Sequence, residues 1–176
     1  MPSVEQAAST RCVLCCFKCF LPISVYFILE WRQGLHKLIH DFVLKKGAKA
    51  FTCRFSRLHS QSFALVADGL GIKSKLTYLD LSDNIGGLGS FNEPNYAGIA
   101  CLCTHLPQTL HLRVLKLARN RLVDECFQLI GHAVGSMPRL QFLDLSGNLC
   151  GVLGAEAIKE AMLSLTPFAG TSKSNK

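Results

Sequence analysis

Apolar and polar positions follow the same order in three segments of the chain, 76–84, 112–120 and 140–148. Each segment reads L-x-x-L-x-L-x-x-N, and the first leucines, Leu76, Leu112 and Leu140, are spaced at intervals of 36 and 28. Alternation with a period of two predicts a short strand that buries one side. The longer interval has its extra residues within 86–98, where Gly, Asn and Pro are frequent and predict a loop.

The second half of each repeat has apolar residues four positions apart, which predicts a helix with one buried face. These pairs are Val66 and Leu70, Leu102 and Leu106, Ile130 and Val134, and Ile158 and Met162. The last two clear segments are 28 residues apart. At the same distance before the first clear segment, the positions expected to hold Leu, Leu, Asn and Leu hold Phe51, Cys53, Ser56 and Leu58. The pattern therefore predicts three clear repeats and one degenerate repeat.

A unit of one strand and one helix cannot cover its own apolar face, so such units must stack on one another. We expect an α/β fold with parallel strands on one side and helices on the other. Asn84, Asn120 and Asn148 come where the chain leaves each strand. Their side-chain amides can bond backbone N–H and C=O groups of the loops, so we expect them to form a structural ladder between repeats.

These residues resemble the leucine-rich repeat family, and the period of 28 with a helical second half is similar to its ribonuclease-inhibitor-like class. The resemblance covers about residues 48–165 and is strongest in 76–165. It implies a short right-handed solenoid with strands on the concave face and helices on the convex face. Similar repeats occur in inhibitors, immune sensors, actin regulators, ciliary proteins and GTPase-activating proteins, so the resemblance implies protein recognition without naming a partner.

Residues that flank the buried leucines should point to the concave face. They form a first row of Tyr78, Val114 and Phe142, a second row of Asp80, Lys116 and Asp144, and a third row of Ser82, Ala118 and Ser146, with Asp83 and Arg119 just beyond. Exposed aromatic residues are typical of interfaces. The alternating charges of the second row have two interpretations, cross-strand ion pairs or selection of a partner by charge. The candidate partner-binding residues are Tyr78, Asp80, Val114, Lys116, Arg119, Phe142 and Asp144.

Composition and the repeat pattern divide the chain into four parts. Residues 1–31 form an apolar, Cys-rich segment, residues 32–47 a basic amphipathic helix, residues 48–165 the repeats, and residues 166–176 a polar, disordered tail. Residues 1–75 carry 11 Lys and Arg against 4 Asp and Glu, which accounts for the whole formal charge of +7. The basic stretch 32–57 would suit an anionic surface, whether a membrane, a nucleic acid or an acidic protein, and a solvated basic face without a partner is the other interpretation. Nucleic-acid binding is not favoured, because interleaved aromatic residues are missing.

The apolar run 12–29 is at the lower limit for a membrane span and contains Lys18 and Pro22. Buried packing and membrane insertion are its two interpretations. Nine cysteines, an odd number, and the absence of an N-x-S/T acceptor favour a reducing compartment, so we expect a cytoplasmic protein, with membrane association as the alternative.

Three groups superficially resemble metal sites. Cys12, Cys15, Cys16 and Cys19 have no second ligand pair; His36 and His40 lack the glutamate of H-E-x-x-H; and Cys101, Cys103 and His105 are expected to be ordinary outer-face residues of a helix. We predict no metal, no cofactor and no enzymatic activity.

The sequence thus predicts an interaction module or scaffold that binds a protein partner through its concave face. The alternatives are a membrane-associated adaptor, held by the apolar run 12–29 and the basic stretch 32–57, and a GTPase regulator of the RanGAP-like type. The tail offers no obvious cap for the last helix, so we also expect self-association or a bound partner at one end.

Overall fold

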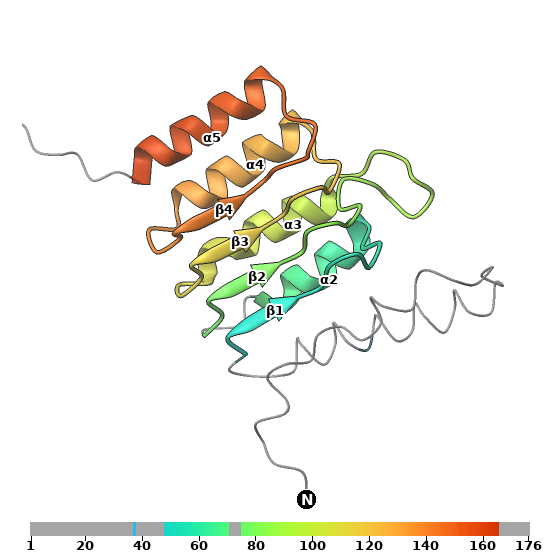
Figure 1. The fold of residues 1–176 in the computed structure, drawn as a ribbon, viewed down its shortest axis with the longest axis horizontal. Helices are drawn as coiled ribbons and strands as arrows, with labels where there is room; N and C mark the ends of the chain where they lie inside the picture. The colour runs from blue at the N-terminus through green and yellow to red at the C-terminus, as the bar shows by residue number, and fades with distance from the viewer. Residues whose placement is uncertain (1–36, 38–47, 71–74, 166–176) are drawn as a thin grey trace, which may run out of the picture.

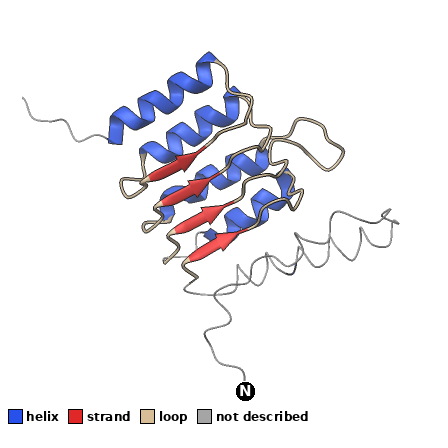
Figure 2. Ribbon diagram, viewed as in Figure 1, coloured by secondary structure: helices blue, strands red, loops and turns tan. Residues whose placement is uncertain are grey.

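In the part of the chain that the structure describes, four short strands lie side by side in one layer, and four helices cover one face of that layer (Figures 1 and 2). The computed structural model describes residues 37, 48–70 and 75–165. The predicted segments 1–31, most of 32–47 and 166–176 lie outside these residues. Strands and helices alternate along the chain, which confirms the α/β class and a short solenoid like that of leucine-rich repeats.

The strands are β1 (Ala50–Thr52), β2 (Tyr78–Asp80), β3 (Val114–Lys116) and β4 (Phe142–Asp144), and they pair in parallel in the order of the sequence. Each strand aligns with its neighbour at the same repeat position, so that Leu79 faces Leu115 and Leu115 faces Leu143. The degenerate first repeat keeps this register, because Phe51 pairs with Leu79. Aligned repeats place every central leucine on the side of the sheet that the helices cover.

The helices are α2 (Ser60–Leu70), α3 (Ala97–His105), α4 (Asp124–Gly135) and α5 (Val152–Leu165), and the short 3-10 helix η3 (Leu106–Gln108) extends α3. The helical residues that the sequence pattern places inward are buried in the first three repeats: Val66, Leu70, Leu102, Leu106, Ile130 and Val134. They pack with the strand leucines in one continuous core. Burial of this apolar surface is the main stabilising contribution to the stack.

The insertion between β2 and α3 is fastened to the preceding repeat. Leu88 and Pro94 form an isolated antiparallel bridge within it, and Ser60 N–H at the start of α2 donates to the Leu88 carbonyl at 2.8 Å. Gly98 N–H at the start of α3 donates to Ser60 Oγ at 2.7 Å. A Cβ at Gly98 would lie 1.9 Å from the Ser60 carbonyl oxygen, so only glycine permits this approach. Ser60 therefore ties the first helix, the insertion and the second helix together.

The stack is open at its last described repeat. Val134 in α4 is 2% exposed, whereas Met162, its equivalent in α5, is 61% exposed. Leu143 and Leu145 are half-buried, although the matching leucines of β2 and β3 are fully buried. Within the described residues, α5 thus exposes an apolar side.

Candidate binding surface

The face of the sheet that the helices leave uncovered is called the strand face here, and its residues come from the flanking positions of β2, β3 and β4. Tyr78, Val114 and Phe142 are aligned by the strand register, as are Asp80, Lys116 and Asp144. Phe142 is 50% exposed, and Tyr78 and Val114 are half-buried. The strand face therefore carries a row of accessible apolar side chains next to a row of charged residues.

Lys116 lies between the two aromatic residues of the first row. Its Nζ is 5.6 Å from the centre of the Tyr78 ring and 5.5 Å from that of the Phe142 ring. Both distances are within the range of a cation–π interaction, which contributes about 0.5–1 kcal/mol at an exposed site. No carboxylate of the described residues lies within 4.0 Å of Lys116 Nζ. The ladder of ion pairs suggested by the alternating charges is therefore not formed.

The two aspartates of the charged row bond the loops that follow their own strands. Asp80 Oδ1 accepts the N–H of Ser82 at 3.0 Å, Asp80 Oδ2 accepts the hydroxyl of Tyr78 at 3.3 Å, and Asp80 is only 3% exposed. Asp144 Oδ1 accepts both the N–H and the hydroxyl of Ser146, at 3.0 and 2.7 Å. The hydrogen bonds from Ser146 lower the pKa of Asp144. Asp80 thus lies inside the structure, while Asp144 stays accessible at the edge of the strand face.

Asp83 joins two arginines from the repeats on either side. Its Oδ2 accepts hydrogen bonds from Arg54 Nη2 at 2.7 Å and from Arg119 Nη2 at 3.0 Å, and Arg119 Nε contacts its Oδ1. The hydrogen bond from Arg119 is the main cause that lowers the pKa of Asp83. Burial opposes this effect, and the hydrogen bond from Arg54 lowers the pKa further. Asp83 and Arg119 were expected just beyond the third row, whereas Arg54 was not expected at this surface. Opposite charges at one position of successive repeats were the available signal for Asp83 and Arg119. Arg54 lies one position earlier in the first repeat, where Phe55 takes the position of Asp83, so this signal could not find it.

The three asparagines bond the loop backbones of their own and the preceding repeat. Asn84 Nδ2 donates to the carbonyls of Cys53 and Leu81, at 2.7 and 2.8 Å, and its Oδ1 accepts from Ser56 N–H and Leu58 N–H, at 3.0 and 3.1 Å. Asn120 and Asn148 occupy the same position one and two repeats later. The asparagines thus bridge the loops of consecutive repeats.

Asn120 is fully buried. Its Nδ2 donates to the carbonyls of Leu81, Leu117 and Ala118, at 2.9, 3.1 and 3.1 Å, and its Oδ1 accepts the N–H of Gly86 at 3.3 Å. Asn148 Oδ1 accepts the N–H groups of Asn120 and Leu122, at 2.7 and 3.2 Å.

The group Cys101, Cys103 and His105 does not converge. Cys101 and His105 share one side of α3, with Sγ and Nδ1 3.9 Å apart, but Cys103 is 6% exposed and packs in the core. The expectation of three outer-face residues was therefore wrong for Cys103, because each helix buries one side against the neighbouring helix as well as one against the sheet. Burial raises the pKa of the Cys103 thiol to about 12. In residues 48–70 and 75–165, no three His, Cys, Asp or Glu side chains are placed to hold a metal ion.

Two other sequence candidates, the four cysteines from Cys12 to Cys19 and the pair His36 and His40, lie outside the described residues. Across the described part of the chain, no helix combines the length and the apolar character that crossing a membrane requires.

Comparisons with known proteins agree with this geometry at the level of the fold. No protein-family profile matches the chain, and no curated protein matches its sequence. Solved structures do match, among them Leiomodin-1 Actin-Binding Site 2 (ABS2), with a TM-score of 0.58 over 81% of this chain and 75% of that chain. The fold is therefore like that of a short leucine-rich-repeat solenoid. The two sequences are 10% identical, so the likeness concerns the fold of the repeats and not their surfaces.

Proposed function

We propose that the chain is a protein-interaction module that binds its partner on the strand face, through Tyr78, Val114, Lys116, Phe142 and Asp144, with Arg119 at the rim. The observation that carries the proposal is the position of Lys116 between two accessible aromatic rings. Aromatic residues supply large contact areas with few rotatable bonds, which is why they are frequent at the centres of interfaces. Asp80 supports the surface from below, because its carboxylate holds the Tyr78 hydroxyl.

The strand face combines the rings of Tyr78 and Phe142, the cation Lys116 and an acidic edge at Asp144. This combination suits an extended protein segment that offers a carboxylate to Lys116 and apolar side chains to the first row. Lys116 has no carboxylate partner among the described residues, so a partner's acidic group would gain a new ion pair without displacing an existing one. Charge complementarity of this kind governs specificity and association rate more than total affinity.

The repeats fit the ribonuclease-inhibitor-like class in the interval of 28 between the last two clear repeats and in the α-helical second half of each unit. We place the boundaries of the repeat domain at about 48 and 165, and we favour a cytoplasmic location on the basis of the cysteine content. Actin is the first partner to test, because the similar fold of Leiomodin-1 is named as an actin-binding site.

The test compares the wild-type chain with a Tyr78→Ala, Phe142→Ala double variant in cosedimentation with filamentous actin and in affinity capture from cell extract. The matched control is Phe91→Ala, because Phe91 is 92% exposed in the insertion and lies away from the strand face. We expect bound proteins to be lost with the double variant and kept with the control. Far-UV circular dichroism verifies that both variants are folded.

Lys116→Met then tests the charge alone, because methionine keeps an unbranched apolar side chain between the rings. Weaker binding that becomes independent of salt would identify Lys116 as the residue that meets an acidic group. Partners that bind the wild type, the double variant and Phe91→Ala equally would place the binding site elsewhere and refute the proposal.

A further inference from the structure

The side of α5 that faces away from α4 has a regular order of side chains. Val152, Glu156, Lys159 and Leu163 follow one another at intervals of three or four residues, so they share one face of the helix. All four are exposed, and Val152 and Leu163 are 73% and 61% exposed. The face therefore has an apolar residue at each end and two opposite charges in the middle.

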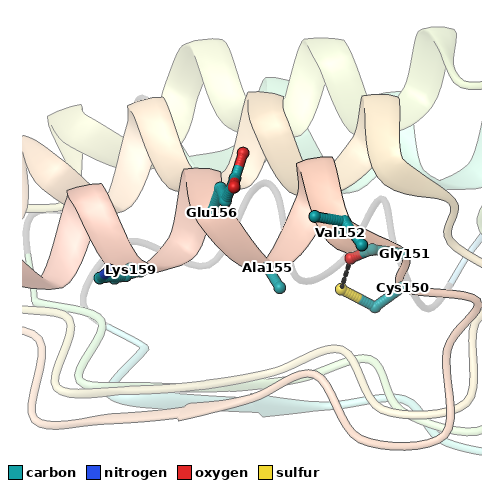
Figure 3. Close-up of a pocket in the computed structure, with 6 residues that line it drawn as sticks. All are labelled: Cys150, Gly151, Val152, Ala155, Glu156 and Lys159. Carbon is teal, nitrogen blue, oxygen red and sulfur yellow. Dashed lines mark hydrogen bonds between the residues drawn. The ribbon is translucent and has the colours of Figure 1, made fainter.

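A hollow of about 470 Å³ lies at the beginning of this face. It is lined by Cys150, Gly151, Val152, Ala155, Glu156 and Lys159, and Figure 3 shows these residues along the start of α5. The opposite end of the face carries Met162 and Leu163, which are each 61% exposed. One end of the face is thus hollow and the other end carries large apolar side chains.

The face differs from the surfaces that join the inner repeats. α4 approaches α5 through Gly131 and Gly135, and a Cβ at Gly131 would be 2.8 Å from the Ala157 carbonyl oxygen. In α5 the same repeat positions, one interval of 28 later, are Lys159 and Leu163. A further helix could not approach α5 as closely as α5 approaches α4. The face is therefore suited to an occupant other than another repeat in the same packing.

When two copies of this face run in opposite directions, apolar positions lie opposite apolar positions and opposite charges lie opposite each other. If two α5 helices lie antiparallel around a twofold axis midway between residues 157 and 158, Val152 lies opposite Leu163 and Glu156 lies opposite Lys159. Each copy then brings Met162 and Leu163 to the hollow of the other copy. A twofold interface requires one patch that complements itself, and the order of apolar and charged side chains on this face satisfies the requirement.

We propose that this face is a homodimer interface, in which two copies of the chain associate through antiparallel α5 helices. The strand faces of both copies stay uncovered, so the dimer presents two partner-binding surfaces. The proposal depends on α5 and the two residues before it, and it is independent of the function assigned to the strand face.

Sedimentation velocity of the full chain, from about 1 to 100 µM, is the first measurement, and a dimer that forms within this range is expected. Val152→Glu places a charge where an apolar contact is required, and Lys159→Glu places like charges opposite each other. Each substitution should weaken the dimer at least tenfold. Leu153→Glu is the matched control, because Leu153 is 60% exposed in the same turn but points away from the face, and it should leave the dimer unchanged.

The decisive variant exchanges the two charges, Glu156→Lys together with Lys159→Glu. In the antiparallel arrangement this exchange restores both cross-pairs, so dimerisation should return to within about threefold of the wild type. Circular dichroism verifies that each variant keeps its helices. A wild-type chain that is monomeric at the highest concentration, an oligomer unaffected by Val152→Glu and Lys159→Glu, equal loss with Leu153→Glu, or failure of the exchange to restore the dimer would each overturn the proposal.

Discussion

Substitution of Asn120 by alanine tests the asparagine ladder most directly, because Asn120 is fully buried in the middle of the stack. The three carbonyls that accept its amide protons each keep another donor. Leu81 O also accepts from Asn84 Nδ2, Leu117 O from Asn148 Nδ2, and Ala118 O from the N–H of Asp83. The buried N–H of Gly86, by contrast, has Asn120 Oδ1 as its only acceptor within the described residues.

The expected cost follows from this difference. One buried donor left without an acceptor costs about 1–3 kcal/mol, and the weakened carbonyl bonds add to it, so we expect Asn120→Ala to lower the free energy of unfolding by about 2–3 kcal/mol. That is a large share of the roughly 5–15 kcal/mol that stabilises an ordinary domain. Equilibrium unfolding in urea, followed by circular dichroism, measures the loss. Gln141→Ala is the control, because it removes an exposed amide and should change the stability by less than about 0.5 kcal/mol.

Asn120→Asp separates the donors from the acceptor. The carboxylate keeps an acceptor for Gly86 N–H but turns a negative charge toward three carbonyl oxygens, so the folded state raises the pKa of this carboxyl group. The variant should be at least as unstable as Asn120→Ala at pH 7 and should regain stability as the pH falls and the carboxyl group is protonated. An Asn120→Ala variant that is no less stable than the Gln141→Ala control, or an Asn120→Asp variant as stable as the wild type at pH 7, would refute the reasoning.

Two further predictions concern helix packing and pH. Gly131→Ala should destabilise the protein by about 1–3 kcal/mol, because its Cβ would meet the Ala157 backbone at 2.8 Å. Gly135→Ala is the control and should be tolerated, because its Cβ would meet only the Ser164 hydroxyl, at 3.1 Å. Equal losses of stability in the thermal unfolding of the two variants would contradict this prediction. Asp83 has a lowered pKa, so its ion pairs with Arg54 and Arg119 stabilise the fold above about pH 4 and are lost as the pH falls through the lowered value. Urea midpoints between pH 7 and 2 should therefore fall less steeply in Asp83→Asn, and identical pH profiles would contradict this expectation.

The repeat pattern predicted most of the fold because solenoid contacts recur at a fixed interval. Leu79, Leu115 and Leu143 pair in the predicted register, and Phe51 takes the same position in the degenerate repeat. A single period therefore determined the strand order, the buried side of each strand and the inward side of each helix. The same reasoning missed the burial of Cys103, because the interval does not show how closely adjacent helices approach.

The chemistry of the strand face was less predictable. Alternating charges at Asp80, Lys116 and Asp144 suggested ion pairs, but each aspartate bonds the backbone N–H of its own loop two residues later, and Lys116 lies over aromatic rings. Local loop bonds need little ordering of long side chains, so they compete well with exposed ion pairs. The choice between such partners depends on loop geometry, which the repeat interval does not specify.

The attachment of Ser60 to both the insertion and the start of α3 has a consequence for how the molecule comes apart. In a linear array each unit is held only by its neighbours. Within the described residues, the first two repeats are bonded to each other through Ser60, while α5 leaves Met162 and Leu163 exposed. Melting should therefore start at α5 and travel toward the amino-terminal repeats. Amide protons of α2 and α3 would exchange with deuterated solvent last, and a mechanical pull would peel the chain from its carboxyl-terminal side.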